Sequence, residues 1–292
     1  MSFDPLAVLS EIWKYEFMQH AFEAGTIVAL VAGVTGYFVV VRRSAFTAHA
    51  FSEIGFAGAA GAVLLDIPPI AGLLLGSILG ALAIAALGRR ATNRDTQIGI
   101  VLAFALGLGL LFISPALYKG GYASEAYSIL FGEILGVSSG SVVLTLIAGI
   151  DILVVVGLLY RPLLFASLDE DVAEAKGLPM LPLGVVFLVT VAVAVSFAVQ
   201  VTGVLLIFSL MVTPAATAQQ LVKRPGQAVA VSASIAVAAT WAGLLLGYFT
   251  SFPVSFFITG IAFSVYVVIR GLRVVVSLRG PSRRTHGTGT RD

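Results

Sequence analysis

Long uninterrupted apolar runs constrain this chain more than any other feature. A helix needs about 20 apolar residues to cross the roughly 30 Å hydrocarbon core of a bilayer. Runs of about that length occupy 17–41, 70–87, 142–159 and 183–199. Only 11% of the residues are charged, against about a quarter in a soluble domain. The weak alternation of an outer-membrane barrel is absent. The sequence therefore predicts an integral membrane protein that crosses the bilayer as helices.

The fold class that these runs predict is all-α, a polytopic bundle of about eight or nine transmembrane helices. We expect spans near 17–41, 46–65, 69–88, 96–114, 141–160, 181–199, 203–222, 227–249 and 252–270. The stretch 125–140 is too short and too rich in glycine for a crossing, so we expect a short helix that dips in from the outer face. The domain division is an outer segment 1–16, a transmembrane domain 17–270, and a basic, disordered tail 271–292.

The basic residues predict how the bundle is oriented. Fifteen of the 17 lie at alternate connections or at the C-terminal end, and only Lys14 and Lys119 lie elsewhere. Positively charged loops stay on the cytoplasmic side. We therefore expect the N-terminus outside and the C-terminus in the cytoplasm. The first residues carry no basic n-region or cleavage site, so we expect the first span to be retained.

Two ionisable residues stand close together inside the second span. His49 and Glu53 are four residues apart, so their side chains lie on one face of a helix. An ionisable group at membrane depth costs about 2.5–3.5 kcal/mol on insertion scales and marks a functional site by default. Imidazole nitrogen with carboxylate oxygen suits Zn²⁺ or Mn²⁺. The spacing alone also allows a purely structural hydrogen bond. Other ionisable residues near the spans are Glu16, His20, Glu23, Glu133 and Asp151.

Glycines recur at helical spacing in two neighbouring spans. Gly72, Gly76 and Gly80 stand every four residues, and Gly55 and Gly58 precede them in the second span. Small residues allow helices to approach closely in lipid. The pattern predicts close helix packing, either within one bundle or between subunits.

The longest internal polar segment, 160–182, predicts a short cytoplasmic helix. Ser167 and Glu170 match an N-terminal capping box, and Gly177 followed by Pro179 predicts the end of the helix. Such a helix is either a simple linker between two spans or a docking element for another protein.

Four segments in order carry a family resemblance over nearly the whole chain, from about Phe17 to Ile269. They are "VVVRRSAFTAHAFSEIGFAGAA", "SILFGEILGVSSG", "EDVAEAKG" and "VTGVLLIFSLMVTPAATAQQL". Together they resemble the membrane permease subunits of the zinc, manganese and iron ABC uptake transporters. The resemblance implies a permease of the cytoplasmic membrane that is not itself an enzyme. It also implies a homodimer with the ion pathway at its interface, an outer metal-binding protein, and a separate cytoplasmic ATPase that holds the ATP.

The resemblance also assigns roles to particular residues. It makes 168–178 the coupling helix, where we expect Glu170, Asp171, Glu174 and Gly177 to contact the ATPase. In the family an aspartate and, four residues later, a histidine coordinate the metal. Here His49 and Glu53 occupy those places, so the donor types are kept in reversed order.

The implied cargo is a divalent transition metal. We expect zinc first, because imidazole suits it and its intrinsic affinity exceeds that of manganese, with manganese or iron as alternatives. No permanently bound cofactor is expected, and the absence of cysteine argues against a thiolate metal site.

Two other functions compete with this interpretation. An ABC permease for a metal chelate, such as a siderophore or cobalamin, would use a wide and uncharged pathway. An ATP-independent secondary transporter would show inverted repeats with interrupted spans. Nothing in the sequence indicates a nucleic-acid partner.

Overall fold

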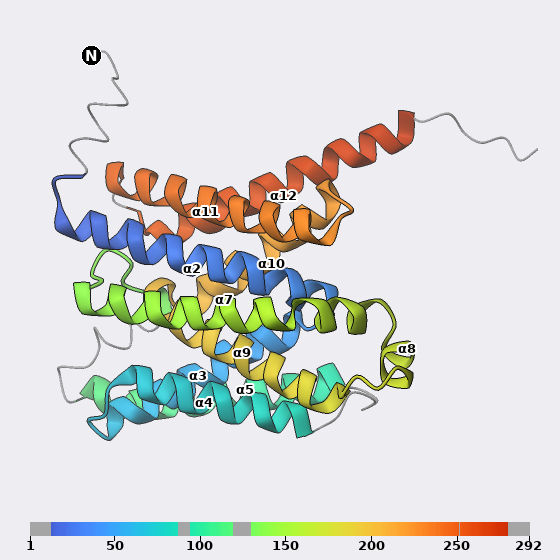
Figure 1. The fold of residues 1–292 in the computed structure, drawn as a ribbon. Coiled ribbons are helices and arrows are strands. Elements are labelled where there is room, and N and C mark those ends of the chain that lie inside the picture. The colour runs from blue at the N-terminus through green and yellow to red at the C-terminus, as the bar shows by residue number, and fades with distance from the viewer. Residues whose placement is uncertain (1–12, 87–93, 119–129, 251, 280–292) are drawn as a thin grey trace, which may run out of the picture.

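The computed structural model describes residues 13–86, 94–118, 130–250 and 252–279 (Figure 1). Within these ranges the chain is helical and contains no strand. The helices are α2 (Glu16–Val41), α3 (Ala45–Leu64), α4 (Pro69–Ala86), α5 (Arg94–Tyr118), α7 (Ser139–Leu168), α8 (Glu170–Ala175), α9 (Met180–Thr202), α10 (Val204–Leu221), α11 (Pro225–Phe249) and α12 (Val254–Arg279).

Seven of the described helices are long and apolar enough to cross a membrane. They are α2, α4, α5, α7, α9, α11 and α12. The helix α10 lies in the same bundle and, with 18 residues, is as long as α4. The helix α3 has sufficient length but a more polar sequence that includes His49 and Glu53. The structure confirms a polytopic all-α membrane protein.

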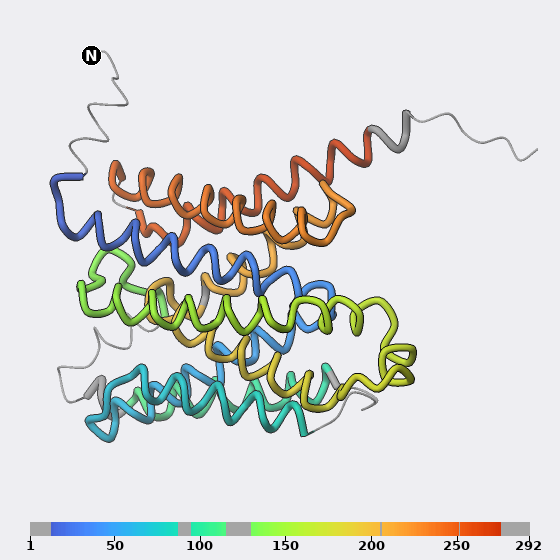
Figure 2. Tube along the Cα trace, viewed as in Figure 1, coloured from blue at the N-terminus to red at the C-terminus, as the bar shows by residue number. Residues whose placement is uncertain are grey.

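The bundle consists of two groups of helices that α9 joins. One group contains α2, α10, α11 and α12, and the other contains α3, α4 and α5. The helix α9 packs against α4 and α3 on one side and against α2, α7 and α10 on the other. Figure 2 shows the long helices running roughly side by side through the bundle.

All nine predicted spans are helices, but the ends of two of them were placed wrongly. The helix α7 continues to Leu168, and α12 continues to Arg279. In α7 the extension places Leu163 and Ala166 in the core with no exposed surface, and this burial stabilises a helix that includes Pro162. The rest of the predicted tail, 280–292, and most of the N-terminal segment 1–16 lie outside the described residues.

The predicted capping box is also wrong, because α7 continues past Ser167. Ser167 lies in the last turn of α7, where its hydroxyl donates to the Leu163 carbonyl at 2.6 Å. Asp169 caps α8 instead, and its carboxylate accepts a hydrogen bond from the Val172 N–H at 3.0 Å. A carboxylate at this position satisfies an N–H that has no partner within the helix.

The predicted end of α8 at Gly177 is confirmed. Gly177 has φ +83°, and its N–H donates to the Glu174 carbonyl at 2.9 Å. The Leu178 N–H donates to the Ala173 carbonyl at 3.1 Å. These two bonds form a Schellman motif, which favours glycine because the left-handed conformation strains other residues. Pro179 follows, as the sequence predicts.

The junction between α9 and α10 packs against the segment that precedes α7. Gly203 and Gly132 both have positive φ, and a Cβ on either one would overlap the backbone of the other segment. The Ser255 hydroxyl donates to the Phe131 carbonyl at 3.1 Å and ties α12 to the same place. The predicted dipping helix at 125–140 does not continue through its described part: 130–131 are helical, 132–138 form this turn and an irregular segment, and α7 begins at Ser139. The first half of the predicted helix lies outside the described residues.

Glycines bring α3 and α4 into backbone contact. A Cβ on Gly58 would overlap the Gly72 carbonyl, and a Cβ on Gly76 would lie 2.9 Å from the Ile54 carbonyl oxygen. The Ser77 hydroxyl donates to the Phe51 carbonyl at 3.0 Å across the same interface. The predicted close packing is therefore found inside one bundle.

Several basic connections share one end of the bundle. Figure 1 shows the α2–α3 turn, α8 and the C-terminal end of α12 at that end. Arg42, Arg43 and Lys176 lie in these elements. A common end for the positive charges is the arrangement that the positive-inside rule requires.

Candidate metal site

The candidate site lies on α3, where His49 and Glu53 project one turn apart. Glu53 is 5% exposed, and His49 is half-buried. The helix begins at Ala45, directly after the short turn that ends α2. It packs chiefly against α4 and α5 and also contacts α9 and α10. Glu53 is therefore enclosed by the bundle, whereas the His49 ring keeps a partly exposed surface beside α10.

Both side chains carry buried polar atoms that lack a partner. Within the described residues, no hydrogen bond is made by His49 Nδ1 or by Glu53 Oε2. The nearby Ser52 hydroxyl donates at 2.7 Å to the backbone carbonyl of His49, not to its ring. A buried polar group without a partner costs about 1–3 kcal/mol. These orphaned atoms fit ligands for an ion better than a structural hydrogen bond.

The helix α10 covers one side of the histidine. The rings of His49 and Phe208 lie 4.9 Å apart between centroids and are tilted by 55°. Ser209 and Thr213 follow on α10, and both are partly exposed. No hydrogen bond joins their hydroxyls to the described residues, whereas the Thr217 hydroxyl donates to the Thr213 carbonyl at 2.7 Å. Ser209 and Thr213 stand four residues apart, so these two hydroxyls share one face of α10, adjacent to the face that carries Phe208.

The other ionisable residues of the sequence analysis do not join the pair. Glu133 and Asp151 are both exposed, Glu133 before α7 and Asp151 within it. Glu16 and Glu23 are exposed on the first turns of α2, with His20 half-buried between them. Among the described residues, no group of three histidine, cysteine, aspartate or glutamate side chains could hold a metal ion. His49 and Glu53 therefore supply two protein donors, and a bound ion needs further ligands.

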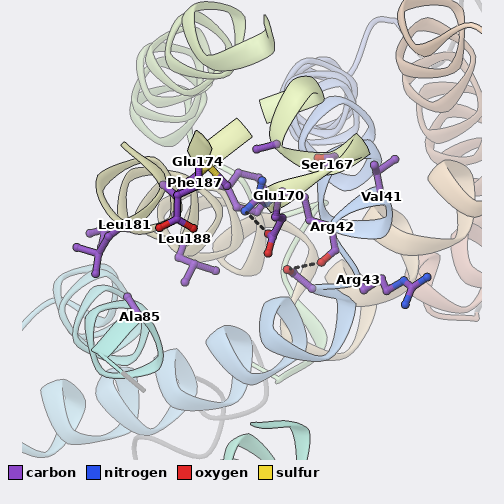
Figure 3. A pocket seen from close by; sticks show the side chains of 15 residues that line it. Val41, Arg42, Arg43, Ala85, Ser167, Glu170, Glu174, Leu181, Phe187 and Leu188 are labelled. Atoms are coloured by element: carbon purple, nitrogen blue, oxygen red, sulfur yellow. Dashed lines mark hydrogen bonds and ion pairs between the residues drawn. The ribbon is translucent and has the colours of Figure 1, made fainter. Parts of the chain in front are cut away.

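The four predicted coupling residues lie together on α8 and at its end. Glu170, Asp171, Glu174 and Gly177 are all exposed, and Ala173 is the one fully buried residue of this helix. Glu170 and Glu174 face a cavity of about 780 Å³ beneath α8, while Asp171 does not line it. Figure 3 shows the Glu170 carboxylate directed towards Arg42. Glu170 therefore faces the membrane domain of this chain.

The sequence analysis missed Ser209, Thr213, Gln200 and Arg42. Gln200, near the end of α9, has a buried Oε1 without a partner in the described residues. Ser209 and Thr213 stand four apart in an apolar helix, so the spacing used for His49 could have found them. No sequence spacing could have found Arg42, because only the fold brings it next to Glu170.

Comparisons with known proteins assign the chain to a family. Residues 14–272 match the model of the ABC 3 transport family. An uncharacterised membrane protein of Cyanophora paradoxa is 34% identical over 242 residues, which is 82% of this chain and 80% of the relative. The manganese transport system membrane protein MntC of Halalkalibacterium halodurans is 28% identical over 235 residues, 80% of each chain.

Solved structures agree with this assignment. PsaBC from Streptococcus pneumoniae, solved in complex with Fab, matches with a TM-score of 0.82 and 26% identity, covering 93% of this chain and 100% of the other. An inward-facing putative metal-chelate type ABC transporter matches with a TM-score of 0.68 and 15% identity, which shows the fold alone. The family match covers all of the described bundle except the end of α12, and the chain is therefore a member of the ABC 3 transport family.

Proposed function

We propose that this chain is the membrane permease of an ABC importer and that it moves a divalent transition metal ion into the cytoplasm. The observation that carries the proposal is the pair His49 and Glu53 on α3, with buried donor atoms that lack partners. The family match and the relatives named as manganese transport proteins support the same class of function. ATP hydrolysis belongs to a separate subunit.

Manganese is the first candidate for the cargo. Relatives from Halalkalibacterium halodurans, Listeria monocytogenes and Streptococcus parasanguinis are named as manganese transport or import proteins. A carboxylate oxygen suits Mn²⁺, and imidazole is acceptable to most of these metals. Zinc, which the sequence analysis favoured on intrinsic affinity, and iron are the competing cargoes. The reversed order of His49 and Glu53 leaves the donor types unchanged.

The helix α8 is the proposed docking site for the ATPase. It stands at the end of the bundle where the basic connections gather (Figure 1). Leu168 is 84% exposed just before it, and Val172 within it is 43% exposed. Burial of these two apolar side chains against an ATPase subunit would favour docking. Asp171, which does not line the cavity beneath α8, supplies a charge for this contact.

Two further partners complete the proposed importer. An extracytoplasmic binding protein delivers the metal at the end of the bundle opposite α8. A second copy of the chain lies against the first, with both His49–Glu53 pairs facing the shared pathway. The partly exposed face of α10 beside His49 is available for this arrangement.

Uptake by vesicles that contain the permease and its ATPase tests the proposal. We expect His49→Ala or Glu53→Gln to reduce ATP-dependent Mn²⁺ uptake at least about tenfold, because the first removes a ligand and the second its negative charge, and loss of even an outer-shell partner costs about 10–100-fold. The matched controls are His20→Ala and Glu23→Gln, which change the same residue types on the first turns of α2. The controls should transport like the wild type.

Two outcomes would contradict the proposal. Wild-type uptake in both pair variants would remove His49 and Glu53 from the mechanism. Uptake of a metal chelate, but not of the free ion, would favour the chelate importer. Competition among Mn²⁺, Zn²⁺ and Fe²⁺ in the same vesicles ranks the cargoes.

A further inference from the structure

A buried arginine lies between α8 and the helix that carries the candidate metal site. Arg42 follows the last residue of α2, and its side chain is 9% exposed. One guanidinium nitrogen, Nη2, lies 3.9 Å from Glu170 Oε1 on α8. The guanidinium carbon lies 5.3 Å from the centroid of the Phe187 ring on α9. Figure 3 shows these groups in the cavity beneath α8.

The position of Arg42 is fixed to α3 by a short turn. The Arg43 N–H donates to the Val40 carbonyl at 3.1 Å, and the Ser44 N–H donates to the Val39 carbonyl at 2.8 Å. Arg43 adopts φ +54°, a left-handed conformation that is uncommon for a residue with a side chain. The next helix begins at Ala45. The turn therefore contains no flexible segment that could absorb a movement of Arg42.

We propose that Arg42 is a positioning residue through which α8 sets the position of α3. The inference rests on the proposed function, because α8 moves only if an ATPase docks on it. A displacement of α8 moves the Glu170 carboxylate, and electrostatic attraction pulls the Arg42 guanidinium in the same direction. The rigid turn passes this movement to α3. His49 and Glu53 then move together relative to Phe208 on α10.

This role differs from the one that the sequence predicted for Glu170. The sequence placed Glu170 on the surface that contacts the ATPase. In the structure its carboxylate faces Arg42, although 53% of its side chain is exposed. An ion pair with a half-exposed member adds little to stability. Loss of the pair should therefore leave the fold intact and change how transport depends on ATP hydrolysis.

The number of metal ions imported per ATP hydrolysed is the quantity to measure. In vesicles with the complete transporter, we expect Arg42→Gln and Glu170→Gln each to lower this ratio about tenfold, a common size for coupling between sites. ATP hydrolysis should stay within about twofold of the wild type, because neither variant alters the partner's nucleotide site. The exchange of charges, Arg42→Glu with Glu170→Arg, should restore most of the ratio.

The neighbouring residue provides a matched control. Arg43 lines the same cavity, but its side chain is exposed and points away from Glu170 in Figure 3. Arg43→Gln removes the same charge from the same turn and should keep the wild-type ratio. The inference is overturned if Arg42→Gln keeps that ratio, or if the charge exchange restores nothing although the protein reaches the membrane in normal amount.

A second measurement does not depend on metal transport. The chain contains no cysteine, so spin labels on Ala175→Cys, at the exposed end of α8, and on Leu65→Cys report the distance between α8 and the outer end of α3. In the complex, ATP should change this distance when Arg42 is present and leave it unchanged in Arg42→Gln. The same change in both backgrounds would refute the link. If the wild type shows the distance change but imports no metal, the proposed function fails and the link stands.

Discussion

The contact between α3 and α4 allows one substitution to be predicted in detail. Gly58→Ala places a methyl group where the Gly72 carbonyl lies, 3.0 Å from its carbon and 3.2 Å from the Gly76 Cα. All of these obstacles are backbone atoms. They cannot rotate aside as a flexible side chain would, so the two helices must separate. Glu53 lies on the same helix, just over one turn away.

The expected loss follows from two opposing effects. Overpacking a tight contact costs about 1–3 kcal/mol, and backbone obstacles place this case at about 2–3 kcal/mol. Alanine exceeds glycine in helix propensity by about 1 kcal/mol. The net destabilisation is therefore about 1–2 kcal/mol. For a chain of this size it corresponds to a fall of about 2–8 °C in the midpoint of thermal unfolding.

A matched glycine tests whether packing is the cause. A Cβ on Gly107, an exposed residue of α5, would meet no atom within 4 Å. Gly107→Ala should therefore keep or raise the midpoint, measured in detergent as the fraction that remains monodisperse after heating. Thiol-reactive dyes cannot be used, because the chain lacks cysteine. An unchanged midpoint for Gly58→Ala would refute the packing argument.

Two other predictions concern α8 and α10. Asp169→Ala should destabilise α8 by about 1 kcal/mol through loss of its cap, visible as faster amide hydrogen exchange over 170–175. Ser167→Ala should not change that exchange, because its hydroxyl bonds within α7. Ser209→Ala combined with Thr213→Val should slow metal uptake several-fold, because it removes two hydroxyls without partners among the described residues from the helix that contacts His49, while Ser234→Ala on α11 should not. Equal uptake rates in these two variants would exclude the hydroxyls from the pathway.

The fold was predictable because membrane insertion depends on local composition. Each span must satisfy its backbone hydrogen bonds within its own helix, so a run of apolar residues indicates a helix without knowledge of its neighbours. The ends of helices follow a different rule. The C-terminal part of α7 is helical because Leu163 and Ala166 are buried against other elements, and this tertiary contact leaves no signal in the local sequence.

The same distinction applies to the candidate site. The spacing of His49 and Glu53 was sufficient to place them on one face of α3. The contact of His49 with Phe208, and of Arg42 with Glu170, joins residues that are far apart in the sequence. Such contacts depend on which helices pack together. The absence of hydrogen-bond partners for Nδ1 and Oε2 likewise emerges only when all neighbours are in place.

A site with two protein donors suits transport better than storage. Structural zinc sites use four protein ligands and hold their metal firmly, whereas a transported ion must also leave. The half-buried His49 leaves room for water or for groups of a second copy to complete the coordination. Because both donors stand on one helix, a shift of α3 moves them together and changes only their relation to α10 and to these outer ligands. At the proposed site, release would then require no rearrangement within the pair, and the proposed link from α8 through Arg42 to the start of α3 would be sufficient to drive it.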